Sequence, residues 1–159
     1  MKKNYNVLSK EDYSTIRATF LSEDFTWNYY RYISDDKDKY YVFKHTYVKD
    51  SNFFGTVNHF NDFLKPLFEF LKIKTVINVT AYLMTKSLNA KKGFDLTSVN
   101  KKTKTAIFYI EHNNGYTKFK KENIENEGNM FVSFSSKENR IEYPTTNKER
   151  RIFLNIEYE

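Results

Sequence analysis

The sequence has no cysteine, only four glycines and two prolines, and no long uninterrupted apolar run. The lack of cysteine excludes disulfides, thiolate metal ligands and a cysteine nucleophile. So few glycines leave no glycine-rich phosphate-binding loop. No stretch approaches the roughly 20 apolar residues of a membrane-spanning helix, and no apolar segment of the signal-peptide kind follows the first lysines. We therefore expect a soluble chain that is neither secreted nor held in a membrane.

Aromatic residues are abundant instead. Tyrosine occurs 13 times and phenylalanine 15 times, and aromatic residues make up 18% of the chain. Large planar side chains suit pleated, half-buried surfaces, so this composition favours a β-rich core. A length of 159 residues lies near the common size of one domain, and we expect residues 1–159 to form a single domain.

The chain is moderately basic, with a formal net charge of +6. Its densest run of lysines extends from Lys91 to Lys121, which would permit contact with nucleic acid. No helix-turn-helix, zinc-finger or RNA-binding aromatic motif accompanies these lysines. A solvated lysine-rich face is the simpler interpretation, so nucleic acid is a possible but not a favoured partner.

Two segments have the signature of amphipathic helices. Ser9-Lys10-Glu11-Asp12 has the form of a capping box, and apolar residues then recur at helical spacing, which predicts a helix over residues 10–22. A second apolar stripe predicts a helix over residues 58–72. Pro66 lies inside this second segment and predicts a kink or a restart there.

Strand patterns dominate the rest of the chain. The expected strands cover residues 25–33, 40–48, 77–84, 103–111, 116–120, 129–134 and 150–158. Asn113-Asn114-Gly115 lies between two of them, and Asn-Gly is a strong signal for a tight hairpin turn with positive φ. Short strands after a helical N-terminal part predict a jelly-roll-like sandwich that helices brace on one side.

Three segments together resemble a known family. KTAIFYIEHNNGYTKF at 104–119, NMFVSF at 129–134 and ERRIFLNIEY at 149–158 are similar to the C-terminal half of small phage- and marine-virus-encoded proteins. Those proteins belong to the iron(II)/2-oxoglutarate-dependent oxygenase superfamily, in its prolyl-4-hydroxylase-like branch. The resemblance implies an α+β, mainly β fold: a double-stranded β-helix, jelly-roll and cupin-like, with flanking N-terminal helices.

The resemblance also implies positions for a metal site. Members of the family bind iron(II) through a His-x-Asp pair and a later histidine, which leaves open positions for 2-oxoglutarate and oxygen. In this sequence the corresponding positions hold Asp95, Thr97 and Arg140, and Arg151 stands at the position that binds the cosubstrate carboxylate. A guanidinium has no lone pair to donate to a metal. The triad is therefore apparently lost, and we expect no metal, no cofactor and no catalytic residue.

No other residues supply an evident catalytic site. His45, His59 and His112 are the three histidines of the chain, and none has metal-ligand spacing. For Arg151 two interpretations stay open: a remnant carboxylate-binding residue, or an ordinary strand arginine that pairs with Glu142 or Glu157. At the vacated site we predict a partly buried ion pair between Asp95 and Arg140.

The sequence thus predicts a catalytically inactive oxygenase-like protein that acts as a structural or binding module. Such a module would be a component of a phage virion, in the neck, tail or capsid, with other virion or assembly proteins or further copies of itself as partners. It would reside in the host cytoplasm or in the assembled virion. Two alternatives stay open: an active iron(II)/2-oxoglutarate dioxygenase that hydroxylates a protein or a nucleobase, and a nucleic-acid-binding protein.

Overall fold

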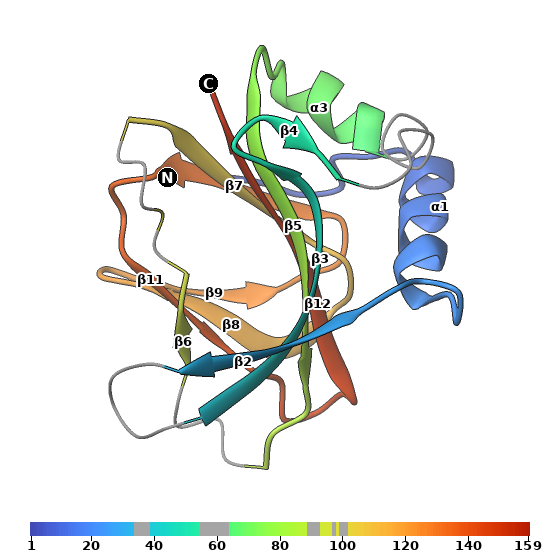
Figure 1. The fold of residues 1–159 in the computed structure, drawn as a ribbon, viewed down its shortest axis with the longest axis vertical. Coiled ribbons are helices and arrows are strands. Elements are labelled where there is room, and N and C mark those ends of the chain that lie inside the picture. The colour runs from blue at the N-terminus through green and yellow to red at the C-terminus, as the bar shows by residue number, and fades with distance from the viewer. Residues whose placement is uncertain (34–38, 55–63, 89–92, 97, 99–101) are drawn as a thin grey trace.

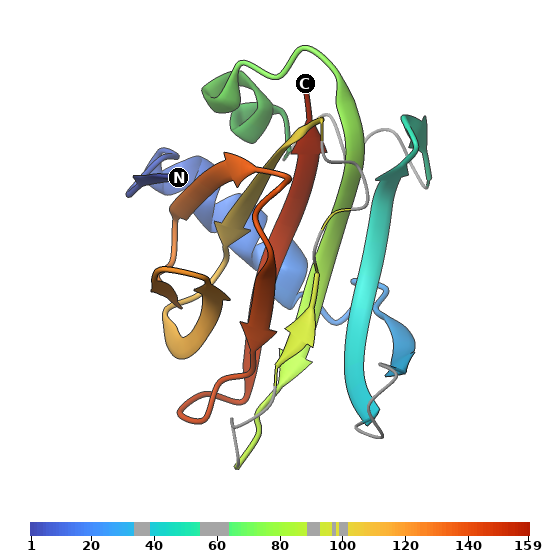
Figure 2. The same ribbon diagram turned by 90° about the vertical axis from the view of Figure 1, so that its left-hand side faces the viewer.

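Two antiparallel β-sheets face each other, and helices cover the outer face of the larger sheet in the computed structural model (Figure 1). The structure describes residues 1–33, 39–54, 64–88, 93–96, 98 and 102–159. Within these residues the larger sheet has the strand order β1-β10-β7-β12-β5-β3-β2, with β4 paired to β3. The smaller sheet has the order β6-β11-β8-β9. Figure 2 shows α1 passing behind the larger sheet, on the side away from the smaller one.

The elements have the following bounds. The helices are α1 (Lys10–Leu21) and α3 (Lys65–Leu71). The strands are β1 (Lys2–Asn4), β2 (Asn28–Ile33), β3 (Lys39–Lys49), β4 (Asn52–Phe53), β5 (Val76–Thr85), β6 (Phe94–Asp95), β7 (Lys104–Tyr109), β8 (Asn113–Phe119), β9 (Asn123–Asn126), β10 (Met130–Ser135), β11 (Arg140–Tyr143) and β12 (Arg150–Tyr158). No helix among the described residues has the length and apolar character needed to cross a membrane.

The first predicted helix is confirmed. Ser9 is the N-cap of α1, and its Oγ accepts a hydrogen bond of 3.1 Å from the backbone N–H of Asp12. The helix buries Ile16 and Phe20 against the larger sheet. Ile16 and Phe20 pack on the sheet together because the apolar residues of α1 recur at helical spacing and so lie on one face of the helix.

The second predicted helix is described only in its later part, because residues 58–63 of the predicted span, with His59, lie outside the described residues. There α3 begins at Lys65, with Pro66 in its first turn. Proline fits a first helical turn, where its missing N–H has no intrahelical acceptor. The predicted restart at Pro66 is thus consistent with the start of α3.

Replacing Ser9 by alanine is expected to lower the free energy of unfolding by about 1 kcal/mol, because the N–H of Asp12 loses its acceptor. Ser14→Ala is the matched control, since Ser14 is exposed in the interior of the same helix. Urea denaturation followed by circular dichroism measures both variants. Equal stability of the two would show that the cap contributes nothing.

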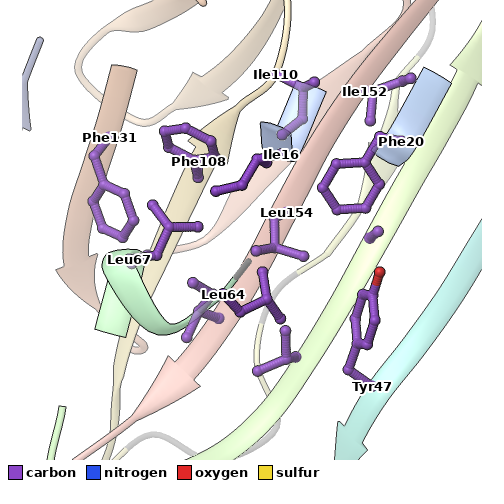
Figure 3. Close-up of a cluster of buried hydrophobic side chains, with 14 of the residues drawn as sticks. Ile16, Phe20, Tyr47, Leu64, Leu67, Phe108, Ile110, Phe131, Ile152 and Leu154 are labelled. Atoms are coloured by element: carbon purple, nitrogen blue, oxygen red, sulfur yellow. The ribbon is translucent and has the colours of Figure 1, made fainter. Parts of the chain in front are cut away.

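Strand β12 lies at the centre of the larger sheet, between β7 and β5, and its alternation defines two cores. Ile152, Leu154 and Ile156 face the helices, where they pack with Ile16, Phe20, Leu64 and Leu67 (Figure 3). Phe153 belongs to the second core, between the two sheets, with residues of both. The two-residue period of a strand therefore directs Arg151 and Asn155 to the interior between the sheets as well.

The predicted turn at Asn113-Asn114-Gly115 is wrong. These residues are the start of β8, which lies in the smaller sheet, whereas β7 belongs to the larger one. The hairpin instead joins β8 to β9, where the N–H of Phe119 donates to the carbonyl of Glu122. The chain crosses from the larger to the smaller sheet after Ile110. The tertiary connection therefore overrides the local preference of Asn-Gly for a tight turn.

Gly115 has a different role from the one its turn signal suggested. The β8–β9 register shifts between Asn113 and Tyr116, which marks an irregularity in the ladder there. A Cβ at position 115 would lie 2.6 Å from Cδ of Arg151 and 2.9 Å from Oδ1 of Asn113. Glycine is required at this point because the Arg151 side chain passes directly over the backbone.

Candidate functional site

Charged side chains meet in the space between the two sheets. Arg140 and Glu142 alternate with exposed Ile141 along β11, so both point inward from the smaller sheet. Arg151 points inward from β12 on the opposite sheet. The exposed fraction is 2% for Arg140 and 0% for Glu142 and Arg151. We call these three residues the interior charge cluster.

Glu142 lies between the two arginines. Its Oε2 lies 2.9 Å from Nη2 of Arg151 and accepts a 2.7 Å hydrogen bond from Oγ1 of Thr117. Its other oxygen, Oε1, lies 3.2 Å from Nε of Arg140. One carboxylate thus contacts a guanidinium from each sheet, which makes the cluster a link between them.

Arg151 is held by several acceptors. Its Nε donates to Oδ1 of Asn126 at 2.7 Å, and its Nη1 donates to the carbonyl of Tyr143 at 2.9 Å. Its guanidinium carbon lies 4.7 Å from the centre of the Phe153 ring. Charge-assisted hydrogen bonds of this kind are about twice as strong as neutral ones. The side chain is therefore fixed in one orientation.

Thr117 connects the cluster to Tyr109 in the larger sheet. Because its Oγ1 donates to Glu142, it can accept at the same time from Nη2 of Arg151, at 3.0 Å, and from the hydroxyl of Tyr109, at 2.7 Å. Burial raises the pKa of Tyr109 well above its ordinary value. Its hydroxyl therefore keeps its proton and serves as the donor.

Arg140 is held on its other side by the larger sheet. Its Nη2 donates to Oδ1 of Asn155 at 2.6 Å, and its guanidinium carbon lies 5.2 Å from the centre of the Phe134 ring. Burial also raises the pKa of nearby Tyr82 to about 12, although the positive charge of Arg140 opposes this rise. The surroundings of Arg140 are aromatic and amide groups, which suit a planar cation.

The structure brings together two of the four residues that the resemblance singled out. Arg140 and Arg151 meet at Glu142, whereas Thr97 lies outside the described residues. Asp95 pairs with Ile141 across β6 and β11, and its side chain is exposed. The ion pair predicted between Asp95 and Arg140 is a wrong assignment, because the carboxylate against Arg140 is that of Glu142. A carboxylate two positions along the same strand points to the same face, so it reaches Arg140 within the interior.

The other candidate residues lie elsewhere. Nδ1 of His45 lies 2.8 Å from the carbonyl oxygen of Thr26, and the His45 ring packs on Phe25 at 4.9 Å between ring centres. His112 is exposed. Among the described residues, no three His, Cys, Asp or Glu side chains are grouped to hold a metal ion.

Sequence reasoning missed several members of the site. Thr117, Asn126 and Asn155 were not singled out, and Glu142 was named only as a possible partner of Arg151. The alternation in Arg140-Ile141-Glu142-Tyr143 was the available signal, because it places one acid and one base on the same face of a strand. The four residues are too few for that pattern to stand out among the surrounding polar residues.

No protein-family model matches the sequence, and neither does any curated protein. Solved structures do resemble the chain in fold. A Pseudomonas putida prolyl-4-hydroxylase has a TM-score of 0.67 at 10% identity, covering 99% of this chain and 91% of that one. The fold is that of the 2OG-Fe(II) oxygenases.

Two further structures agree with this fold. An oxidoreductase of the 2OG-Fe(II) oxygenase family from Burkholderia pseudomallei has a TM-score of 0.65 at 9% identity, covering 97% of this chain and 82% of that one. AviO1 from Streptomyces viridochromogenes Tue57 has a TM-score of 0.57 at 10% identity, covering 96% and 86%. The predicted fold class, a mainly β jelly-roll with flanking helices, is confirmed. Identities this low show likeness of fold alone, and function has to be argued from the site.

Proposed function

We propose that this protein is a non-catalytic binding or structural module built on the oxygenase-type fold. The observation that carries the proposal is the interior charge cluster, in which Arg140 and Arg151 both contact Glu142 between the sheets. A cluster of this kind cross-links the two sheets through charged side chains and occupies interior space with protein atoms.

The described residues of the cluster do not suit iron(II). Arg140 stands where the resemblance expects a histidine, and a guanidinium offers a metal no lone pair and repels it. Glu142 is the carboxylate at this place, but one of its oxygens contacts Arg140 and the other accepts from Thr117 and contacts Arg151. A metal ion would have to displace these contacts.

The geometry of Arg151 also supports a structural role. Its guanidinium already donates hydrogen bonds to Asn126 and the Tyr143 carbonyl and forms an ion pair with Glu142. A dicarboxylate that approached this guanidinium would compete with Glu142 for Nη2. Of the two interpretations of Arg151 that the sequence left open, the pairing with Glu142 is the one that these contacts favour.

Iron(II) and 2-oxoglutarate, added together or separately, are expected to leave the melting temperature unchanged, because a ligand stabilises only the state that it binds. Differential scanning fluorimetry under anaerobic conditions measures this, and a succinate-release assay with a mixed peptide and nucleobase panel follows turnover. A reproducible rise in the melting temperature with both ligands, or succinate release above the protein-free blank, would establish the alternative of an active dioxygenase.

We further propose a specific role for this module: it serves in the assembly of a phage particle, in the host cytoplasm or in the virion. The support is the resemblance to phage and marine-virus proteins and the exposed aromatic side chains on β2 and at β4. Tyr29, Tyr30, Phe53 and Phe54 are each between 44% and 57% exposed. Tyrosine and phenylalanine are enriched in interfaces between proteins.

Particle association can be tested directly. The protein is expected to co-sediment with assembled particles from an infected lysate, and a Tyr29→Ser/Phe53→Ser variant is expected to remain in the soluble fraction. Light scattering coupled to size exclusion, on the purified protein, tests whether a second copy binds through these aromatic side chains. The assembly role would be contradicted if the unchanged protein, like the variant, were found only in the soluble fraction and were a monomer. The non-catalytic proposal would still stand.

A further inference from the structure

A basic hollow lies at one end of the larger sheet, away from the interior charge cluster. Its volume is about 700 Å³. The residues that line it are Met1, Lys2, Lys102, Thr103, Lys104, Ser133, Phe134, Ser135, Lys137 and Tyr158. Four of these are lysines, and the described residues of the lining include no carboxylate.

Strand register explains how the lysines come together. Lys2 of β1 is opposite Ser133 of β10, while Lys104 of β7 is opposite both Ser135 of β10 and Tyr158 of β12. Side chains directly opposite each other in a sheet share a face. These side chains therefore form two adjacent rows on one face of the larger sheet. With strands about 4.8 Å apart and a rise of about 3.3 Å per residue, the Cα atoms of Lys2 and Lys104 are roughly 12 Å apart.

This face is the one that the helices cover further along the strands. Ala106 and Phe108 follow Lys104 on the same side of β7, and both belong to the core beneath α1 and α3. The hollow begins where that cover ends, so Lys2, Lys104 and Lys137 are exposed to solvent. Both chain ends lie toward this end of the molecule (Figure 1).

Two acidic residues near the hollow, Glu122 and Glu157, are directed away from it. Glu122 pairs with Lys3, which points to the opposite face of β1 from Lys2. Glu157 points into the interior between the sheets, where Nδ2 of Asn78 donates to its Oε2 at 2.7 Å. The positive charge on this face is therefore not offset by the acids on β12 and in the β8–β9 turn.

We propose that the basic hollow binds the phosphate backbone of duplex nucleic acid. Lysine ammonium groups are point charges that donate hydrogen bonds to phosphate oxygens, and the hydroxyls of Ser133 and Ser135 are further donors. A duplex carries one negative charge for about every 1.7 Å of its axis. Several phosphates can thus reach lysines that are spread over two rows of the sheet.

The aromatic residues of the hollow decide between duplex and single strand. Single-stranded nucleic acid is bound largely by stacking its bases on exposed aromatic rings. The two aromatic residues of the lining are Phe134 and Tyr158, and each is only 6% exposed, with the Phe134 ring turned to the core between the sheets. Because the described residues of the lining include no exposed ring, we expect the hollow to recognise backbone charge and not bases. Binding is accordingly independent of sequence and strongest for the more densely charged duplex.

The test compares two triple variants that remove the same charge. Lys2→Gln/Lys104→Gln/Lys137→Gln changes the hollow, and Lys118→Gln/Lys120→Gln/Lys121→Gln changes exposed lysines at the end of β8 in the other sheet. Binding to a short fluorescein-labelled DNA duplex and to labelled oligothymidylate is followed by fluorescence anisotropy over a series of salt concentrations. Thermal unfolding confirms that both variants are folded.

The unchanged protein is expected to bind the duplex more tightly than oligothymidylate. Loss of three phosphate contacts is expected to weaken duplex binding at least about tenfold at low salt. It should also make the plot of log affinity against log salt shallower by about 3 units, while the control triple stays within about twofold. Three results would each overturn the site: no binding by the unchanged protein, an equal loss in both triples, or tighter binding of the single strand. None of them bears on the iron and 2-oxoglutarate test.

Discussion

Glu142→Ala is expected to lower the free energy of unfolding by about 3 to 5 kcal/mol, because it leaves two buried guanidinium groups without their common carboxylate. Arg140 and Arg151 are almost fully buried, so water cannot take the place of the missing oxygens. The loss also removes the acceptor of the Thr117 hydroxyl. Guanidinium chloride denaturation measures the change as a lower midpoint at constant slope.

A matched control shows whether the loss of stability comes from burial of the ion pair or from removal of any charged pair. Glu69 pairs with Lys65 at 3.8 Å on the surface of α3, and both side chains are more than 60% exposed. Glu69→Ala is therefore expected to change stability by no more than about 0.5 kcal/mol. If Glu142→Ala were as mild as this control, the cluster would not hold the two sheets together.

A third variant tests whether the cluster acts as a unit. Replacing all three members by apolar residues, Arg140→Met/Glu142→Leu/Arg151→Met, is expected to cost less than the sum of the single changes. An apolar replacement leaves no buried charge without a partner, whereas each single change does. Additive losses would mean that the three side chains contribute independently.

Gly115→Val is expected to destabilise the protein by about 2 to 3 kcal/mol. The new Cβ would lie 2.6 Å from Cδ of Arg151, and Arg151 has no room to move because Asn126 and Glu142 hold its guanidinium. Forcing extra atoms into a packed interior costs about 1 to 3 kcal/mol, and a displaced Arg151 loses hydrogen bonds as well. Thermal and chemical denaturation measure the effect.

Testing Gly115→Val in a second protein, one that lacks the Arg151 side chain, shows whether Arg151 or the backbone conformation at position 115 requires glycine. In an Arg151→Met protein, whose shorter, more flexible side chain can give way, Gly115→Val is expected to cost clearly less than in the unchanged protein. If Gly115→Val cost the same in both backgrounds, the need for glycine would come from the backbone at position 115 and not from Arg151.

Local sequence patterns predicted the secondary structure correctly wherever residues close in the sequence determine it. The capping box at Ser9 and the apolar spacing after it predicted α1, since both act within a few residues of each other. The strand pattern of residues 150–158 predicted β12 with its bounds. The turn signal at Asn113-Asn114-Gly115 failed, because the chain leaves one sheet for the other at this point, and a two-residue preference does not record which sheet comes next.

The sequence by itself determined that the chain forms a mainly β jelly-roll with a helix over residues 10–22, which the structure shows at Lys10–Leu21, because periodicity, capping and aromatic content are properties of short segments. It also showed that position 140 holds an arginine, which cannot ligate a metal. Only the tertiary structure decided that the carboxylate beside Arg140 also contacts Arg151. Glu142 and Arg151 come from different sheets, and their contact at 2.9 Å depends on how the sheets stack. In the same way, Lys2 and Lys104 meet at one hollow only because β10 pairs with both of their strands.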